Sequence, residues 1–415
     1  MNNYKKIILN NGLTLYLNTD PSLRQTYVSY SIHYGSNGRW FNFNLDGKDY
    51  HVLPGMAHYL EHLLGERSIS GNMYTNFSRR HQSSNAYTGD DYTCYYFRGI
   101  ENIYESTKDL LEAMENPIFD DKMVNQTRHA ICEEATSCID NYPLIASYLV
   151  EHELFGGFDK FYKTLTSIGN RETTELITTE DLYACYNAFY TKNRESMVIS
   201  GNVNEEKMVD FLNNVIEKLP TNNHLVTLPS LDYSSIRHRD TIIDRPVNDD
   251  INGIGFKAMV PDSLKRIDVQ IAFNLLFSKV LGNASLFSKK CQDEGLLDTY
   301  GYCDYGFIDK YFIFSLTYYG NDRKEFSKRF IDEFNNKNIT EEEFNLLKRE
   351  SLSKIIRGLD KKYSTPKNFT RRIPYTEEYS DKDYILNLTY DRFIEIINSL
   401  DFTNYVETVV REKKR

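Results

Sequence analysis

Two histidines and a glutamate lie close together in the segment His58-Tyr59-Leu60-Glu61-His62. If the segment is helical, positions i and i+4 share one face, so His58 and His62 can bind the same Zn²⁺ ion. Glu61 then lies beside that face, where its carboxylate can take a proton from an attacking water without binding the metal. The order H-x-x-E-H is that of the inverted zinc peptidases. The segment therefore predicts a zinc-dependent hydrolase with one zinc ion per chain.

Chance alone must be weighed against this interpretation. The chain contains nine histidines, and a random H-x-x-E-H is expected in on the order of one such sequence in a hundred. A catalytic zinc site also needs a third protein ligand, because three protein ligands and one open position are typical. The rest of the sequence must therefore supply both the context and the third ligand.

The elements around the motif can be predicted from apolar spacing and turn residues. Residues Lys6–Tyr16 alternate apolar and polar around Asn11-Gly12, which predicts a β-hairpin, and a strand is expected over Thr26–Tyr34. Pro54-Gly55 then indicates a turn or the start of a helix. The leucines of Met56–Glu66 form an apolar stripe, so the motif is expected on a helix.

Further elements follow the motif. A strand is predicted over Thr93–Phe97, then helices around Tyr104–Met114 and Lys122–Ile139, with Pro117 between them because proline interrupts a helix. Another strand is predicted over Ser196–Ser200. The second part of the chain repeats these kinds of element. We expect a strand near Gly253–Val260, a helix near Ile267–Leu281 and a strand at Tyr311–Tyr319.

The stretch 219–230 is the best candidate for a linker, since it holds two prolines and two asparagines and lacks a helical period. It divides the chain into domains at 1–220 and 231–415. A faint repeat supports two related halves: Ile177–Leu182 aligns with Leu388–Phe393, 211 residues later (388 − 177). Both segments are typical of a helix that begins with a threonine cap.

The chain resembles the pitrilysin/insulinase family of inverted-motif zinc peptidases, and in particular the short two-domain type represented by the subunits of mitochondrial processing peptidase. The resemblance covers nearly the whole chain, because several spaced motifs agree in order. The matching residues are Asn11-Gly12-Leu13, Gly35-Ser36, Gly55–His62, Asn85–Thr88, Thr93–Tyr96, Leu281–Leu286 and Glu294-Gly295-Leu296. It implies an α+β fold with two homologous halves, each a mainly antiparallel sheet flanked by helices, and a chamber between them.

The resemblance also implies the third zinc ligand, a glutamate in a Glu-Glu pair that precedes a D-x-P-type bend. Here Glu133 and Glu134 precede Asp140–Pro143. Glu134 is the expected ligand, and Glu133 is the alternative. Adjacent residues of a helix point about 100° apart, so only one of the two can face the metal.

Two further positions follow from the same resemblance. The family carries a carboxylate seven residues before the ligand, and this position is Thr127. A hydroxyl can accept a hydrogen bond but brings no charge, so the metal site is expected to be retuned rather than lost. The segment Asn85–Thr88 is expected at a sheet edge, where Asn85 and Ala86 bind an extended peptide as an added strand. The alternative is that it forms only a loop leading into a strand.

The chain departs from the family in its second half. An arginine and a tyrosine seven residues apart normally stabilise the oxyanion there, but the matching positions are Cys291 and Asp298. Tyr300 and Tyr302 do not restore the pair, because no arginine lies seven residues before either. Loss of one oxyanion donor typically costs about 10²–10³ in rate, so the lone chain would be a weak enzyme. The expected partner is a homologous subunit in a heterodimer, or a second copy in a homodimer.

Composition limits the remaining function classes. Lysine and arginine number 49 against 59 aspartates and glutamates, a net charge of −10, which argues against nucleic acid as a partner and suits basic or unfolded peptides. Mean hydropathy is −0.54 and no apolar run approaches 18 residues, so no membrane span is expected. The short apolar stretch near the amino terminus predicts no export, and six irregularly spaced cysteines indicate buried, reduced thiols. A cytoplasmic location is expected.

Three readings of the site remain open. The leading one is a zinc endopeptidase that cleaves short or unfolded peptides. The second is a non-catalytic assembly subunit with a structural zinc site, although such a site has no need of a general base at Glu61. The third is a zinc hydrolase of non-peptide substrates.

Overall fold

The computed structural model describes most of the chain and divides it into two compact units. The described residues are 4–36, 42–89, 91–155, 168–220, 222, 224–229, 232–359, 366–367, 369–370, 373 and 381–412. The first unit comprises residues 1–136, 166–230 and 361–374, and the second comprises residues 137–165, 231–360 and 375–415. The boundary predicted at 219–230 would make each domain one continuous stretch of the chain. The compact units differ from this, because segment 137–165 belongs to the second unit and segment 361–374 to the first.

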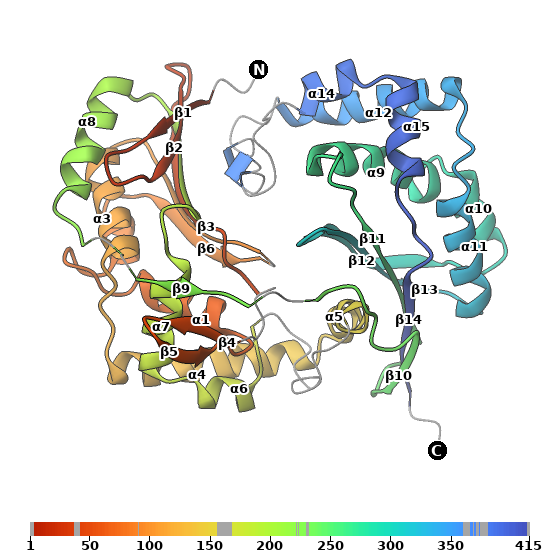
Figure 1. Cartoon of the computed structure of the whole chain (residues 1–415), viewed down its shortest axis with the longest axis horizontal. Coiled ribbons are helices and arrows are strands. Elements are labelled where there is room, and N and C mark those ends of the chain that lie inside the picture. Colours follow the sequence, from red (N-terminus) through yellow and green to blue (C-terminus); the bar gives the residue numbers. More distant parts are fainter. Residues whose placement is uncertain are drawn as a thin grey trace. The chain divides into compact units, whose positions relative to one another are not determined.

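The first unit is built on a six-stranded sheet (Figure 1). Its strands, in spatial order, are β1 (Lys5–Ile8), β2 (Thr14–Thr19), β8 (Glu195–Gly201), β3 (Thr26–Ile32), β7 (Thr93–Gly99) and β6 (Ser83–Thr88). The pairs are antiparallel except β2 with β8. The predicted hairpin around Asn11-Gly12 is confirmed by β1 and β2, and β6 forms an edge of the sheet.

Side chains along β3 point alternately to the two faces of this sheet, and only one face carries the hydrophobic core of the unit. Val28, Tyr30 and Ile32 belong to the hydrophobic core on one face, and Tyr27 and Ser29 alternate with them. Helices supply the other side of that core, namely α1 (Met56–Leu64), α2 (Met73–Arg79), α3 (Ile103–Glu115), α4 (Asp121–Ile139), α7 (Thr179–Phe189) and α8 (Glu205–Ile216). The unit also contains α6 (Arg171–Leu176). The predicted helix over Met56–Glu66 is therefore confirmed.

Part of the predicted linker is ordered in the first unit. Residues Val226–Thr227 form a short strand, β9, which pairs with β4 (Asn42–Leu45). With β5 (Lys48–His51) these strands make a small antiparallel sheet.

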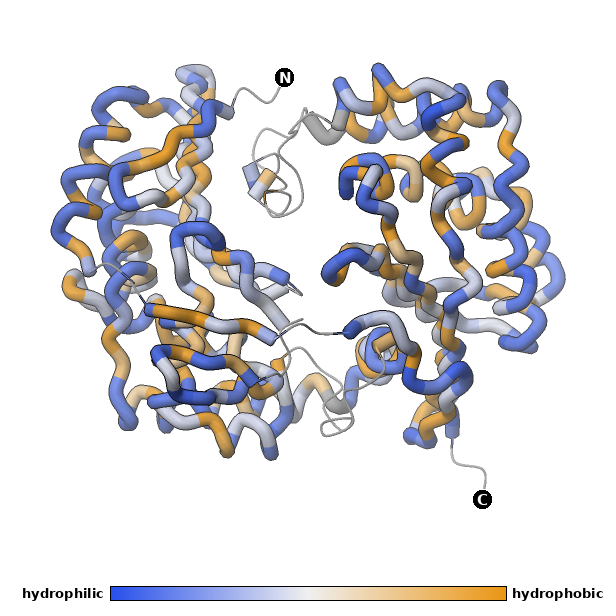
Figure 2. The backbone as a smooth tube through the Cα atoms, viewed as in Figure 1, coloured by the Kyte–Doolittle hydropathy of each residue, from blue (hydrophilic) through white to orange (hydrophobic). Residues whose placement is uncertain are grey.

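The second unit has a five-stranded sheet and its own aromatic core. The strand order is β10 (Asp240–Asp244), β14 (Tyr405–Arg411), β11 (Ile251–Met259), β13 (Tyr311–Tyr319) and β12 (Thr299–Ile308), with β10 and β14 parallel. Its helices are α5 (Tyr142–Leu154), α9 (Arg266–Leu281), α10 (Leu286–Asp293), α11 (Arg323–Asn335), α12 (Glu341–Leu359), α14 (Asp381–Asn387) and α15 (Tyr390–Asn398). Hydrophobic and hydrophilic residues alternate along its outer helices (Figure 2), as expected for amphipathic helices.

Helix α5 packs on the sheet of the second unit, although it precedes the predicted linker in sequence (Figure 1). The approach is so close that two glycines of β11 are required. A Cβ atom at Gly253 or Gly255 would lie 2.6 or 2.3 Å from a methyl group of Val150. Apolar residues of α5, including Leu154, form a separate small core on this face.

The proposed repeat agrees with these elements. Thr178 and Thr389 accept the cap hydrogen bonds of α7 and α15, as predicted from the sequence. Each of these helices follows one of the exchanged segments at a similar distance in the sequence. Segment 137–165 ends 13 residues before Thr178 (178 − 165), and segment 361–374 ends 15 residues before Thr389 (389 − 374). Two homologous halves, each with a mainly antiparallel sheet and flanking helices, account for this arrangement.

One segment does pass the length and hydropathy criteria for a membrane span, contrary to the sequence expectation. It covers residues 266–293, contains α9 and α10, and reaches a mean hydropathy of 1.2. Half of its most apolar window is buried inside the protein, and Phe273 belongs to the core. Such a helix is weak support for a membrane span, since buried core helices meet the same criteria.

All six cysteines are free thiols. Four are buried, as expected, but Cys138 is partly exposed and Cys303 is exposed on the edge strand β12. The expectation of a wholly buried set is therefore wrong for these two residues.

Candidate metal centre

Helix α1 is preceded by a position that only glycine can occupy. Gly55 has a φ of 91°, and a Cβ atom there would lie 2.5 Å from the carbonyl oxygen of Ile168. From this point Leu60, Leu63 and Leu64 anchor the helix in the core. The motif side chains are left on the remaining part of the helix surface.

His58, His62 and Glu134 come together as one group of possible metal ligands. The two Nε2 atoms lie 3.1 Å apart, and Glu134 Oε2 lies 3.6 Å from that of His58 and 3.5 Å from that of His62. Ligand atoms at about 2.0–2.1 Å from a tetrahedral zinc ion are themselves about 3.3 Å apart. The three side chains therefore have the spacing and the chemistry of a zinc site.

Helix α4 carries Glu134 to this group, and it is tied to α1 by a buried hydrogen bond. The Tyr59 hydroxyl, on the motif helix, donates to the carbonyl oxygen of Val124 at 2.6 Å. Both glutamates are exposed, but only Glu134 belongs to the ligand group. Of the two glutamates considered from the sequence, the geometry therefore favours Glu134.

Both imidazoles are held in the neutral form that binds metals. Burial, with a smaller contribution from His62, lowers the pKa of His58 to about 3. Burial also lowers the pKa of His62, and Glu134 opposes this effect. The Nδ1 atom of His58 is buried and has no hydrogen-bond partner within the described residues. Packing therefore orients this ring, with its Nε2 atom directed toward His62 and Glu134.

Glu61 lies next to the ligand group but outside it. The Thr88 hydroxyl donates a hydrogen bond to Glu61 Oε2 at 2.6 Å, and the glutamate is 9% exposed. Burial raises the pKa of Glu61 to about 7, Thr88 opposes this shift, and the charge of Glu134 adds to it. A carboxyl group with a pKa near neutral can accept and return a proton at physiological pH.

Thr88 belongs to β6, which also contains the two predicted substrate-binding residues. Asn85 and Ala86 pair with Tyr96 and Tyr95 of β7, and within the described residues β6 has no partner on its other side. The alternative that these residues form only a loop is therefore wrong. Their placement on an edge strand leaves main-chain groups free for an added peptide.

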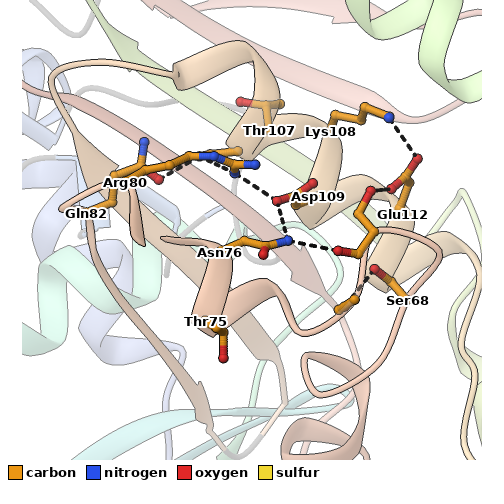
Figure 3. A network of polar contacts seen from close by, with 12 residues as sticks. Ser68, Thr75, Asn76, Arg80, Gln82, Thr107, Lys108, Asp109 and Glu112 are labelled. Atoms are coloured by element: carbon orange, nitrogen blue, oxygen red, sulfur yellow. Dashed lines mark hydrogen bonds and ion pairs between the residues drawn. The ribbon is translucent and has the colours of Figure 1, made fainter. Parts of the chain in front are cut away.

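A polar network near the start of β6 holds α2 against α3 (Figure 3). Figure 3 shows Asp109 between Asn76 and Arg80, which donate to its Oδ2 at 2.9 and 2.8 Å. Arg80 also bonds Ser106, whose hydroxyl donates to Gln82, the residue before β6. Neither this network nor the bond from Thr88 to Glu61 joins residues whose spacing in the sequence predicts the contact.

Three other predicted positions have no part in the ligand group. Thr127 is buried on α4, and among the described contacts no hydrogen bond joins it to the ligands. Cys291, on α10, lies in the core of the second unit. Asp298 is exposed, and its amide donates to the carbonyl of Tyr319. Neither of these two positions supplies an arginine or a tyrosine.

Family profiles match both parts of the chain. The profile described as Insulinase (Peptidase family M16) matches residues 47–166, which include all three ligand residues. The profile described as Peptidase M16 inactive domain matches residues 176–351.

Individual proteins agree with these profiles. The uncharacterized zinc protease YmfH of Bacillus subtilis is 25% identical over 72% of this chain and 71% of its own length. Human insulin-degrading enzyme is 25% identical over 54% of this chain, but only 22% of its own length is matched. An M16-like peptidase from Alicyclobacillus acidocaldarius has the same fold, with a TM-score of 0.84, 22% identity and coverage of 99% and 98% of the two chains. The chain therefore belongs to the insulinase (M16) family of peptidases.

Proposed function

We propose that the protein is a zinc-dependent endopeptidase that cleaves short or unfolded peptides. The observation that carries this proposal is Glu61, a buried carboxyl group beside the three-residue ligand group but not part of it. A structural zinc site would have no use for such a proton acceptor. The names of the relatives, which include zinc proteases, support the same reaction class.

Each residue of the candidate site has a separate role in the proposed hydrolysis. His58, His62 and Glu134 hold zinc, which when bound polarises the peptide carbonyl and makes a water molecule more acidic. Glu61 accepts the proton of the attacking water and passes it to the leaving amine. Thr88 keeps the Glu61 carboxyl group in place through its hydrogen bond. The edge of β6, at Asn85 and Ala86, binds the peptide as an additional strand.

A partner subunit is part of the proposal. Cys291 and Asp298 stand where the family has its arginine and tyrosine, so this chain lacks those two groups for the oxyanion. We propose that a homologous chain supplies them in a heterodimer, with a homodimer as the alternative. Cytoplasmic location remains a prediction from the cysteine content and the amino-terminal sequence.

The test is the variant Glu61→Gln in the full chain, with the partner where one is found. Zinc content, measured by elemental analysis, should equal that of the wild type because Glu61 is not a ligand. Peptide hydrolysis should fall by about 10²–10⁴-fold, the range expected for loss of a general base. Unchanged hydrolysis would overturn the catalytic role and leave the structural zinc site as the better interpretation.

A further inference from the structure

A tyrosine ladder lies on the sheet face of the first unit opposite its helical core. It consists of Tyr27 of β3, Tyr96 of β7 and Tyr87 of β6, one residue from each of three adjacent strands. The rings of Tyr27 and Tyr96 stack at 5.4 Å, and those of Tyr96 and Tyr87 meet edge to face at 6.2 Å. The ladder therefore leads across the sheet to the edge strand on which Thr88 contacts Glu61.

Two residues from far along the sequence, Phe369 and Thr370, contact the first unit. The ring of Phe369 stacks on Tyr4 at 3.9 Å and is 3% exposed. The hydroxyl of Thr370, which is fully buried, lies 3.0 Å from that of Ser29 on β3. These contacts belong to the first unit, which includes residues 361–374. They give Phe369 and Thr370 defined positions against the first unit.

Lys367 brings a positive charge to the edge of the sheet. The Lys367 ammonium lies 5.0 Å from the ring centre of Tyr87 and 5.6 Å from that of Tyr96. The residue is half-buried, and within the described residues no carboxylate pairs with it. Cation–π contacts therefore hold the charge over β6.

A peptide added to β6 would place alternate side chains on this face. The side chain opposite Tyr87 would have its Cβ atom about 4.5–5.5 Å from that of Tyr87, which is beneath the lysine. Thr88, which contacts the proposed general base, is the next residue along the strand, about 3.3 Å away. A carboxylate on the peptide within one or two residues of the scissile bond could therefore reach the ammonium.

We propose that Lys367 makes the peptide-binding edge selective for an acidic side chain next to the scissile bond. This inference rests on the proposed function and names a preference of the same site. It also runs against the net charge of −10 for the whole chain, which suits basic peptides. At physiological ionic strength charges beyond about 8 Å are largely screened. The nearby lysine therefore outweighs the distant acidic surface.

Binding to the zinc-loaded Glu61→Gln chain tests the preference without cleavage. The probes are fluorescein-labelled decapeptides of serine, alanine and valine that carry one central Glu, Gln or Lys, and fluorescence anisotropy measures their affinities. We expect the Glu peptide to bind about 3- to 10-fold more tightly than the Gln peptide. Adding Lys367→Gln should reduce this ratio to about one, while Lys367→Arg should preserve it. Lys207→Gln, on the exposed surface of α8, removes the same charge elsewhere in the unit and should also preserve it.

The results separate this inference from the proposed function. Equal binding of the Glu and Gln peptides, absence of binding, or a Glu preference that survives Lys367→Gln would each overturn the inference. Wild-type hydrolysis of the same peptides is measured in parallel, with cleavage products identified by mass spectrometry. Zinc-dependent cleavage without a charge preference would leave the peptidase assignment intact. A charge-dependent affinity without cleavage, even when a homologous partner chain is present, would support Lys367 and count against catalysis.

Discussion

At the scale of single residues, the position of one carboxylate decides which of two adjacent glutamates can bind zinc. Glu134 Oε2 is within 3.6 Å of both histidine nitrogens, while Glu133 points elsewhere on α4. The Glu-Glu pair could be recognised from the sequence by its resemblance to the family. The resemblance also predicted Glu134 as the ligand, with Glu133 as the alternative. The rotation of α4 about its axis, which depends on how the helix packs, agrees with that prediction.

Glu134→Gln should therefore weaken zinc binding by about 100-fold or more, because an amide is a poor substitute for the carboxylate ligand. Glu133→Gln is the matched control and should retain the wild-type affinity. Competition with a fluorescent zinc chelator measures both. If Glu133→Gln lost the metal and Glu134→Gln kept it, the assignment of the third ligand would be reversed.

A buried charge cluster away from the metal gives a prediction for pH. Lys192 contacts both Glu115 and Glu195, whose side chains are 4% and 1% exposed, so two carboxylates share one cation. Burial raises the pKa of Glu195 to about 7, Glu115 adds to the shift, and Lys192 opposes it. The folded chain thus retains a proton that the unfolded chain releases above its ordinary pKa near 4.5.

The contribution of Glu195 to stability should consequently be present below pH 4.5 and lost as pH rises through about 7. Relative to Glu195→Gln, the wild type should lose about 2 kcal/mol of unfolding free energy between pH 4.5 and 8. Urea unfolding at both pH values measures the difference. The exposed Glu206→Gln variant should show no such change, and a wild-type curve parallel to that of Glu195→Gln would contradict the prediction.

At the scale of elements, the motif helix depends on a tight contact at its start. Pro54-Gly55 indicates a turn or the start of a helix in the sequence, and α1 begins at Met56. The close approach of the Ile168 carbonyl could not be expected, because that residue lies more than a hundred positions later and meets Gly55 only through tertiary packing. The left-handed backbone and this contact both exclude a side chain at residue 55.

Gly55→Ala should destabilise the fold by about 3 kcal/mol or more, since it adds a steric clash to the cost of a left-handed φ. Gly71→Ala is a close control, because Gly71 has the same φ of 91° and open space around its Cβ position. It should cost only about 1–2 kcal/mol. Denaturant unfolding compares the two, and equal losses would show that the Ile168 contact is unimportant.

At the scale of the whole molecule, the chain has three residues placed to bind a metal ion, but Cys291 and Asp298 stand at the positions where the resemblance implies an arginine and a tyrosine. The family resemblance made this difference visible from sequence alone. We therefore expect the purified chain to hydrolyse peptides slowly. Addition of a homologous chain that has an arginine and a tyrosine seven residues apart should raise the rate by about 10²–10³-fold.

Size-exclusion chromatography should show the two chains eluting together, and hydrolysis assays give the rate. A partner whose arginine and tyrosine are both changed to alanine should still bind but should not accelerate hydrolysis. High specific activity of the lone chain at every concentration would refute the need for a partner. Activity that rises with the concentration of the lone chain would favour a homodimer.

The sequence by itself predicted the candidate metal ligands of the motif, the family and most helices and strands, because spacing along one helix and alternation along one strand are local properties. His58, Glu61 and His62 could be assigned in this way. The tertiary structure brought the expected Glu134 beside the two histidines, and it alone showed that Thr88 holds Glu61 and that segments 137–165 and 361–374 exchange between the compact units. Those features join residues that are far apart in the chain, so only the packing of side chains and strands determines them.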